Sequence, residues 1–345
     1  MEEKELVGLF EVAKLAGVSP SAVANWRKRA TDFPAPVVDL KSGPVFRLSQ
    51  IRVWLRKRSV PMATVISTIN LKGGVGKSTT TVAVAEMLSA TFRKKVLVID
   101  LDPQTNATVM LIGEDKWRTL NTEGKTLAQL FKDALEPDES KRKFDIEDSI
   151  QKKVSNVSDV RTLDLLPSSL DLIDVQDRLA GMSSGRFYAE NPTDVLRRAT
   201  RSVLDNYDIV IIDCPPNLGI ITLNGLAISH GYIIPTIPDV LSTYGIPQIV
   251  KRVGQFSDTI AYDIEAYGIV ISKYREQSTT HQNTLRQMKR KSDAPLFETI
   301  IPENDKAADA AEYKPVSTLR QKWGYRGQFD LYKSLTEEIM ERAGI

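Results

Sequence analysis

The feature that most constrains this chain is a glycine-rich loop at residues 71–79, which reads LKGGVGKST. An apolar, β-branched run at 64–69 precedes the loop, and a helical pattern at 80–88 follows it. Three glycines let the backbone curl so that successive N–H groups point at phosphate oxygens, and the following helix adds the positive end of its dipole. The order of strand, loop and helix therefore predicts a phosphate-binding loop within an α/β fold.

Two lysines and a hydroxyl give this loop its predicted chemistry. Lys77 can reach the β- and γ-phosphates of a nucleotide, and the Ser78 hydroxyl can bind Mg²⁺. The general pattern G-x-x-x-x-G-K-[ST] requires glycine at position 71, where this chain has Leu71, and Lys72 places a second lysine near the start of the loop. We expect nucleotide contacts along the whole loop, from Lys72, Gly73, Gly74, Val75, Gly76, Lys77, Ser78 and Thr79.

Seven apolar runs indicate the rest of the fold. They are spaced far enough apart for a helix between each pair, which is typical of a mainly parallel sheet covered by helices on both faces. The runs lie at residues 64–69, 95–99, 162–166, 207–212, 232–237, 268–272 and 297–301. The polar stretch between 114 and 160 predicts helices and a surface loop outside that sheet. We therefore predict a P-loop NTPase domain at 63–345, joined by a linker at 59–62 to a small domain at 1–60.

Carboxylates follow two of the apolar runs directly. Asp100 and Asp102 end the second run, and Asp213 ends the fourth. Parallel strands present their carboxyl ends at the sheet edge where ligands of α/β proteins bind, so these side chains are candidates for the site. A purely structural role is the alternative for a buried carboxylate at a strand end. Asp213 suits a Walker-B-type role, in which it holds a water bound to Mg²⁺.

Charge is distributed unevenly along the chain. The 345 residues carry 46 Lys and Arg against 44 Asp and Glu, yet residues 1–60 hold eleven Lys and Arg against six Asp and Glu. A basic module joined to a nearly neutral body favours a polyanion as the partner of that module. The alternative is an ordinary solvated charged surface.

Several classes of protein are excluded by composition. The single cysteine, Cys214, cannot form an internal disulfide or a four-thiolate zinc site, and we interpret it as an apolar filler. The longest apolar runs are much shorter than the roughly 20 residues of a membrane-spanning helix. The N-terminal residues lack the basic-then-apolar order of a signal peptide, so we expect a cytoplasmic protein.

The pattern of residues 1–60 predicts a winged helix-turn-helix. Helical spacing over 9–16 and a second helix capped by Ser19 precede a hairpin at 37–46 and a closing helix around 51–55. The alternatives are a small helical domain with a solvated basic face and a dimerisation element. If the module binds DNA, we expect the contacts to come from Ser21, Asn25, Arg27 and Lys28.

Both parts of the chain resemble known families. Through residues 12–19 and 47–54, the small module resembles the winged helix-turn-helix modules of MerR-like regulators and excisionases. Through the loop KGGVGKS at 72–78, residues 63–345 resemble the ParA/MinD class of P-loop ATPases, most closely the ParA partition proteins. That resemblance implies ATP, ADP and Mg²⁺ as cofactors and a nucleotide-sandwich homodimer. Lys72 would reach the phosphates of the partner subunit, as an arginine finger does in trans.

The same resemblance implies roles for the strand-end carboxylates. Asp102 would position or deprotonate the attacking water, and Asp100 would support Mg²⁺ through a water. Thr105 stands where the family usually has glycine. We expect that difference to affect the flexibility of the loop without removing a functional group.

A base contact is implied at the end of the seventh run. Pro302 and Asn304 would lie beside the adenine, where their backbone groups could read it. Glu303 stands where the family often has arginine, so we do not expect an arginine at this position to contact the base edge.

Two branches of the class do not fit this sequence. MinD-like members end in a basic amphipathic helix that lies on membranes, whereas residues 335–345 have an acidic polar face, so we expect no membrane binding. Nitrogenase iron proteins need two cysteines per subunit. ParA proteins instead bind DNA without sequence preference as ATP-bound dimers. Candidates for that contact, unless they are simply solvated, are Arg275, Arg286, Lys289, Arg290, Arg320 and Lys322.

We therefore expect a ParA-type partition ATPase associated with nucleoid DNA. A ParB-like centromere-binding partner would stimulate slow hydrolysis, and the module at 1–60 would bind operator DNA for autoregulation. The alternatives are a nucleotide-switched transcription regulator and an ATPase that positions another cargo.

Overall fold

The computed structural model divides the chain into two compact units, Met1–Met62 and Ala63–Ile345. The predicted linker at 59–62, which includes Met62, and the predicted helix cap Ser19 lie outside the described residues. The structure describes residues 6–16, 20–30, 33–40, 43–58, 63–182 and 191–345.

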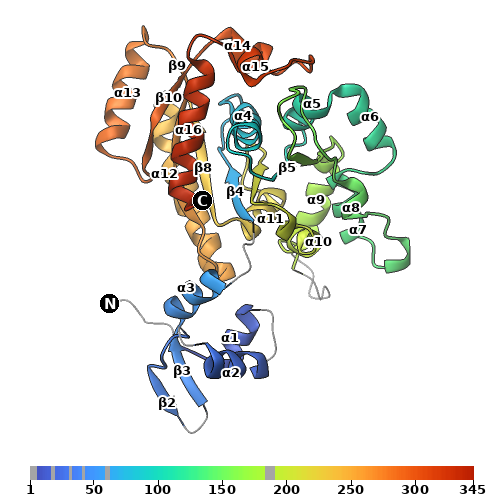
Figure 1. The fold of residues 1–345 in the computed structure, drawn as a ribbon, viewed down its shortest axis with the longest axis vertical. Coiled ribbons are helices and arrows are strands. Elements are labelled where there is room, and N and C mark those ends of the chain that lie inside the picture. The colour runs from blue at the N-terminus through green and yellow to red at the C-terminus, as the bar shows by residue number, and fades with distance from the viewer. Residues whose placement is uncertain (1–5, 17–19, 31–32, 41–42, 59–62, 183–190) are drawn as a thin grey trace. The chain divides into compact units, whose positions relative to one another are not determined.

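A seven-stranded sheet forms the centre of the larger unit (Figure 1). Its order is β10-β9-β8-β4-β7-β5-β6, and all neighbouring strands are parallel. The strands are β4 (Thr64–Thr68), β5 (Val96–Asp100), β6 (Leu163–Leu166), β7 (Ile209–Asp213), β8 (Gly231–Thr236), β9 (Glu265–Tyr274) and β10 (Leu296–Pro302). The structure thus confirms the predicted parallel sheet.

Helices cover both faces of the sheet, as predicted. One layer comprises α4 (Lys77–Ala90), α5 (Asn106–Ile112), α6 (Glu114–Thr122), α14 (Asp305–Asp309), α15 (Leu319–Trp323) and α16 (Gln328–Ala343). The other comprises α7 (Leu127–Ala134), α8 (Ile146–Ser149), α9 (Leu172–Met182), α10 (Val195–Thr200), α11 (Ile220–Ile228), α12 (Val240–Ile260) and α13 (Thr279–Arg290). Among the described residues, no helix combines the length and the apolar character needed to cross a bilayer.

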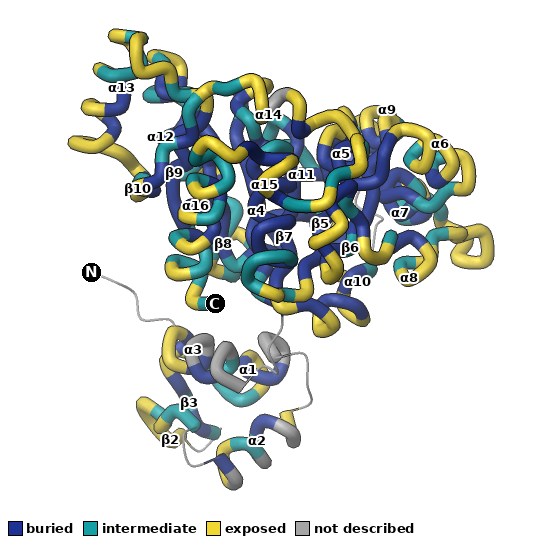
Figure 2. Tube along the Cα trace, turned by 45° about the horizontal axis from the view of Figure 1, so that its top comes forward, coloured by how far each residue is buried: buried dark blue, intermediate teal, exposed yellow. Residues whose placement is uncertain are grey.

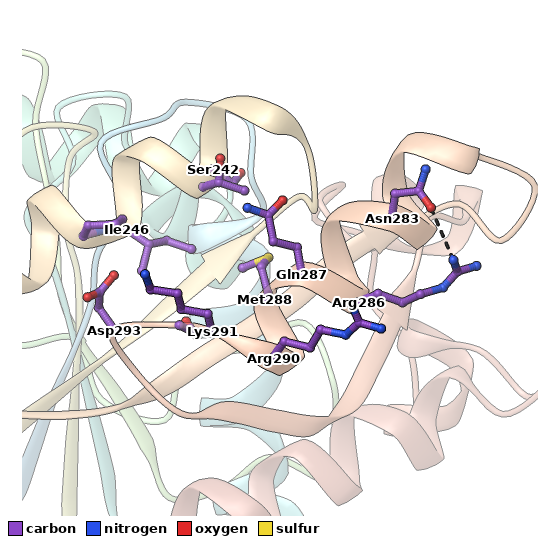
Figure 3. Close-up of a pocket in the computed structure, with 12 residues that line it drawn as sticks. Ser242, Ile246, Asn283, Arg286, Gln287, Met288, Arg290, Lys291 and Asp293 are labelled. Atoms are coloured by element: carbon purple, nitrogen blue, oxygen red, sulfur yellow. Dashed lines mark hydrogen bonds between the residues drawn. The ribbon is translucent and has the colours of Figure 1, made fainter.

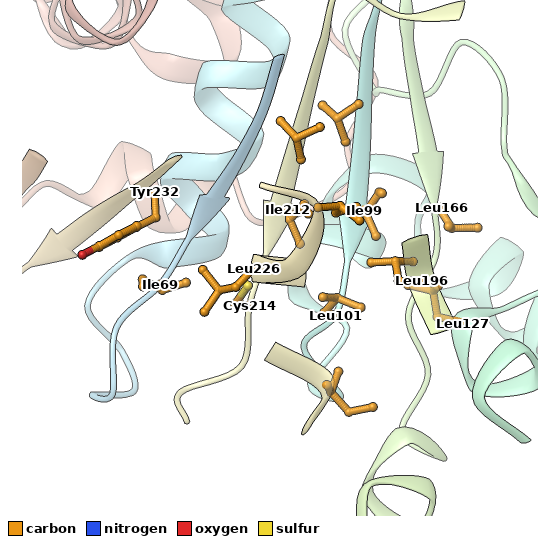
Figure 4. Packing of buried hydrophobic residues seen from close by; sticks show 14 of the residues in the cluster. Ile69, Ile99, Leu101, Leu127, Leu166, Leu196, Ile212, Cys214, Leu226 and Tyr232 are labelled. Carbon is orange, nitrogen blue, oxygen red and sulfur yellow. The ribbon is translucent and has the colours of Figure 1, made fainter. Parts of the chain in front are cut away.

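Each face of the sheet packs into its own hydrophobic cluster. Side chains alternate along a strand, so in β5 Leu97 and Ile99 enter one cluster while Val96 and Val98 enter the other. Figure 4 shows part of the first cluster, in which Ile99 packs near Ile212. Burial is concentrated in these strands, and exposed residues lie along the outer helices and loops (Figure 2). The core therefore fixes where each strand ends, and with it the edge that carries the predicted site.

The smaller unit contains two helices, a hairpin and a closing helix in the predicted order. Its elements are β1 (Leu6–Gly8), α1 (Leu9–Ala16), α2 (Pro20–Arg29), β2 (Val38–Leu40), β3 (Gly43–Arg47) and α3 (Leu48–Arg58). The short strand β1 was not predicted, and it extends the hairpin into the antiparallel sheet β1-β3-β2. Val23, Phe46 and Ile51 belong to its core, and the rings of Trp26 and Trp54 lie 5.6 Å apart.

Candidate functional site

The predicted phosphate loop connects β4 to α4. Gly74 and Gly76 have φ angles of +73° and +86°, a left-handed conformation that favours glycine. A Cβ at Gly73 or Gly74 would meet nothing within 4 Å, so this backbone is open to an approaching phosphate. The loop is held from β9, where the Ser272 hydroxyl donates to the carbonyl of Val75 (2.7 Å).

Lys77 is the first residue of α4 and is buried. Its ammonium donates to the carbonyl of Lys72 at the other end of the loop (3.3 Å). Burial lowers the pKa of Lys77, while the negative charges of Asp213 and Asp102 oppose that shift. The fold thus brings the loop lysine together with two of the three carboxylates singled out from the sequence.

Asp213 ends β7 with one carboxylate oxygen unsatisfied. Its Oδ1 accepts a bond from the Thr81 hydroxyl of α4 (3.3 Å), whereas its buried Oδ2 has no hydrogen-bond partner in the described part of the chain. Burial raises the pKa of Asp213 to about 7, and the nearby Ser78 hydroxyl opposes that shift. A free buried carboxylate oxygen beside a hydroxyl is a donor set that fits Mg²⁺.

The fit favours Mg²⁺ over a metal held entirely by the protein. Within the described residues, no three His, Cys, Asp or Glu side chains form a metal-holding group. Mg²⁺ usually takes one or two carboxylates, and phosphates and waters complete its shell. Cys214, next to Asp213, is buried in the hydrophobic core, as expected of an apolar filler.

Asp100 is fully buried at the end of β5, paired in register with Asp213 of β7. Burial, together with the charge of Asp213, raises the pKa of Asp100 well above its usual range. Its Oδ1 accepts a bond from the N–H of Asp102 (3.1 Å), and its Oδ2 accepts from the N–H (2.8 Å) and hydroxyl (2.7 Å) of Thr108. Asp100 therefore holds the loop after β5. Its contact with Mg²⁺ through a water stays a prediction.

Asp102 lies two residues further on, where burial raises its pKa. The N–H of Gln104 donates to its Oδ1 (3.0 Å) and, like the charge of Lys77, opposes the shift. A carboxylate with a raised pKa near a buried loop lysine is suited to accepting a proton. Thr105 follows with a left-handed φ of +57°, a conformation that glycine adopts easily. This explains why glycine is usual in the family at a position where this chain has threonine.

Lys72 points to a partner that the sequence did not reveal. Its ammonium forms an ion pair with Asp239, and both side chains are partly exposed. Asp239 also caps α12, because its Oδ1 accepts from the N–H and the hydroxyl of Ser242 (both 3.0 Å). In the single chain, therefore, the lysine predicted to act in trans is neutralised in cis.

The predicted base-binding segment lies at the end of β10. Asn304 donates through its side-chain amide to the carbonyl of Pro302 (3.3 Å). Glu303 forms a two-pronged ion pair with Arg275 at the end of β9, with an Nη2–Oε1 distance of 3.0 Å. Arg275, which was predicted to contact DNA, thus places a guanidinium beside the residue that replaces the usual arginine.

Three of the residues predicted to contact DNA lie on α13. Arg286, Lys289 and Arg290 are exposed on this helix. A groove of about 670 Å³ separates α13 from the start of α12, and Figure 3 shows Arg286 and Arg290 beside it, with Met288 and Ile246 on its apolar wall. Cations over a partly apolar groove form a surface that can follow a phosphate backbone.

Of the predicted DNA contacts Arg320 and Lys322, only Arg320 lies on the surface. The prediction that Lys322 contacts DNA is wrong, because its side chain is only 2% exposed and its ammonium binds Glu86 of α4 (2.8 Å) and Asn156 (2.8 Å). Arg320 is exposed but pairs with Asp330 of α16 (2.8 Å). Lys322 was mistaken for a surface cation because its acidic partner Glu86 lies far away in the chain.

Two of the four residues predicted to contact DNA from the smaller unit are exposed. Arg27 and Lys28 are exposed on α2, and Arg27 pairs with Asp39 of β2 (2.7 Å). The side chains of Ser21 and Asn25 lie outside the described residues.

Four supporting side chains were missed from the sequence. Thr81 lies one helical turn after Ser78, so helical spacing could have identified it. Asp239 follows a strand and starts a helix, which is an N-cap signal. Thr108 and Ser168 carry no comparable signal, because their partners are set by the packing of β5 against β6.

Comparison with known proteins agrees with this geometry. Residues 63–266 match the AAA domain family. An uncharacterized protein of Pseudomonas putida is 31% identical over 73% of this chain and 86% of its own length. The chromosome-partitioning ATPase Soj of Thermus thermophilus is 28% identical over 80% of this chain and 95% of its own length.

The fold is also found among solved structures. Cobyrinic acid a,c-diamide synthase from Mycobacterium smegmatis, solved with an ATP analogue and magnesium, has a TM-score of 0.61. It is 23% identical, and the match covers 80% of this chain and 93% of that one. The family match spans more than half of the chain and includes the phosphate loop and all three strand-end carboxylates. This protein therefore belongs to the ParA family of P-loop ATPases.

Proposed function

We propose that this protein partitions DNA, using Mg²⁺-ATP to form a homodimer that binds nucleoid DNA. The observation that carries the proposal is the convergence of Lys77, Ser78, Asp102 and Asp213 at one edge of the sheet. A related Soj protein is a chromosome-partitioning ATPase, and a structure with the same fold holds an ATP analogue with magnesium. Movement of a plasmid or chromosome origin is the function that this combination supports best.

The residues of the site divide the work on the nucleotide. Ser78 would bind Mg²⁺, Asp213 and Asp100 would hold waters bound to it, and the ion would offset negative charge on the phosphates. Lys77 offsets charge on the transferring phosphoryl group from the loop side. Asp102 would orient the attacking water and accept its proton on a carboxylate oxygen.

A second copy of the chain would supply Lys72 in trans. Pairing must then exchange the carboxylate of Asp239 for phosphates of the nucleotide bound to the partner. Large apolar side chains are exposed after the strands that flank the central site, and a second copy would cover them. They are Leu170 and Ile173 after β6, and Val240, Leu241 and Tyr244 after β8.

DNA would be bound by two surfaces. The groove beside α13, with Arg286 and Arg290, would follow phosphates of any sequence in the ATP-bound dimer. The smaller unit would bind the operator of the partition genes, with Arg27 and Lys28 on phosphates or base edges. A ParB-like protein bound at the centromere would stimulate hydrolysis and release the dimer.

The smaller unit also favours a second candidate, a transcription regulator in which the nucleotide is only a switch.

An electrophoretic shift assay separates these two functions. It compares random DNA with the DNA upstream of the gene, each without nucleotide, with ADP and with a slowly hydrolysed ATP analogue. We expect salt-sensitive binding to random DNA only with the analogue, retained in a chain that lacks residues 1–62. Binding to random DNA that ignores the nucleotide, or that is lost with residues 1–62, contradicts partition and favours the regulator.

A further inference from the structure

Both backbone polar groups of Asp102, the N–H and the carbonyl, form hydrogen bonds with buried side chains. Its N–H donates to Oδ1 of Asp100 (3.1 Å), and its carbonyl accepts from the hydroxyl of Ser168 (2.7 Å). Ser168 follows β6, the strand paired with β5 at this edge of the sheet. Residues at the ends of two neighbouring strands therefore hold the backbone of Asp102, the residue that would orient the water.

Two further hydrogen bonds close these contacts into a ring. The N–H of Ser168 donates to the hydroxyl oxygen of Thr108 (3.0 Å), and that hydroxyl donates to Oδ2 of Asp100 (2.7 Å). Asp100, Thr108 and Ser168 are all fully buried. Because the Thr108 hydroxyl both accepts and donates, removing it would break the ring at two points.

The ring is anchored from outside the site as well. The indole N–H of Trp117, on α6, donates to the carbonyl of Ser168 (3.1 Å). Ser169 offers an internal comparison, since it is equally buried but its hydroxyl oxygen accepts from the N–H of Asp171 (3.1 Å) instead. Of these adjacent serines, only Ser168 bonds to Asp102.

We propose that Ser168 and Thr108 are positioning residues for hydrolysis, which fix the backbone of Asp102 through the ring with Asp100. The proposal rests on the function proposed above, in which Asp102 orients the attacking water. A carboxylate must stand within a few tenths of an ångström of its place to act on a water, and displacement by about 1 Å can cost about 100-fold in rate. The ring therefore governs turnover rather than the binding of ATP.

Steady-state ATP hydrolysis by the full chain tests the proposal. Ser168→Ala and Thr108→Val should each lower kcat by about 10- to 100-fold, with KM and the affinity for ATP changed by less than about twofold. Thr108→Ser restores the hydroxyl and should return kcat to within about threefold of the original. Ser169→Ala is the matched control and should leave kcat unchanged. Thermal melting of each variant separates loss of turnover from loss of folding.

Several results would overturn the positioning role. Unchanged kcat in Ser168→Ala and Thr108→Val would do so, as would a drop of equal size in Ser169→Ala. Failure of Thr108→Ser to restore kcat would show that turnover does not depend on the hydroxyl of the ring, and loss of cooperative melting in both ring variants would show that these residues serve folding. The proposed function is tested separately, because intact hydrolysis in Asp102→Ala would remove Asp102 from the reaction whatever the ring variants do.

Discussion

Helix α4 carries two buried clusters of charge that differ in how completely their polar atoms are satisfied. Further along the helix, Glu86 is bonded at both oxygens. Its Oε1 accepts from the Ser155 hydroxyl (2.6 Å) and the Lys322 ammonium (2.8 Å), and its Oε2 accepts from the Trp323 indole (2.8 Å). This cluster ties α4 to the C-terminal part of the chain.

The cluster at the first turn of α4 is built in the opposite way. Lys77 meets a backbone carbonyl, and Asp213 keeps a buried oxygen without a partner among the described residues. Burial shifts the pKa of both groups away from their ordinary values. Buried polar groups are normally satisfied, so a cluster left open beside a glycine-rich loop points to a ligand that completes it. The comparison teaches that a ligand site differs from a structural ion pair less in its burial than in the hydrogen-bond partners that its buried polar atoms lack.

The cluster around Lys77 and Asp213 is called the open cluster below, and the satisfied cluster around Glu86 and Lys322 is called the closed cluster. The largest expected effect comes from the lysine of the open cluster, Lys77. Lys77→Ala should lower kcat/KM for ATP by at least about 1000-fold, because it removes the cation proposed to offset charge on the transferring phosphoryl group while Lys72 is paired with Asp239. Its melting temperature should stay within a few degrees of the original, since burial already disfavours the charged lysine. Hydrolysis assays and thermal melting check both parts. Retained hydrolysis, or collapse of the fold, would break the comparison.

Replacing the lysine of the closed cluster, Lys322, should have the opposite effect: a large loss of stability with little change in ATP binding. Lys322→Ala leaves Glu86 as an uncompensated buried charge and should lower the free energy of unfolding by about 3–5 kcal/mol. The folded fraction should bind ATP within about twofold of the original. Denaturant unfolding and nucleotide titration measure the two quantities. Glu86→Met combined with Lys322→Met should recover part of the stability, and a selective loss of ATP affinity in Lys322→Ala would argue against a purely structural cluster.

The open cluster should also cost stability at neutral pH. The pKa of Asp213 is raised from 3.8 to about 7, so between these values the folded chain holds a proton that the unfolded chain has released. Stability without nucleotide therefore falls as the pH rises through this window, and the raised pKa values of Asp100 and Asp102 act in the same direction. Asp213→Asn should raise the melting temperature at pH 8 more than at pH 5. An equal gain at both pH values would refute the linkage.

The smallest effect is expected at the edge of the open cluster. Asp239→Asn should keep the cap of α12, since asparagine caps as well as aspartate, while it releases Lys72. A partly exposed ion pair is worth about 0–1 kcal/mol, and the homodimer exchanges two of them, so ATP-dependent dimerisation should need up to about 30-fold less protein. Sedimentation in an Asp102→Ala background measures the change. Ser242→Ala, which keeps the ion pair, serves as control, and weaker dimerisation of Asp239→Asn would mean that Asp239 orients Lys72 productively.

The sequence predicted the open cluster far better than the closed one. The order of strand, loop and helix identified Lys77 and Ser78, and strand ends identified Asp213, because local pattern and the parallel sheet together decide where these groups meet. These residues belong to short segments whose conformation is set by their own glycines and β-branched runs.

Pairings between distant segments could not be predicted in this way. Lys322 looked like a surface cation because its partner Glu86 lies 236 residues earlier. The ion pair of Lys72 with Asp239 spans 167 residues, and the contact of Ser168 with Asp102 depends on how β6 packs beside β5. One sequence, without its tertiary packing, holds no signal that joins such residues.

The most direct test of the account is hydrolysis by Asp102→Ala, measured in a single turnover with saturating Mg²⁺-ATP alongside an equilibrium titration of ATP. We predict that this variant binds ATP within about twofold of the original affinity and hydrolyses it at least about 100-fold more slowly, because it keeps the loop and loses the carboxylate that receives the proton of the water. Hydrolysis at the original rate would contradict the assignment of Asp102 and the mechanism built on it.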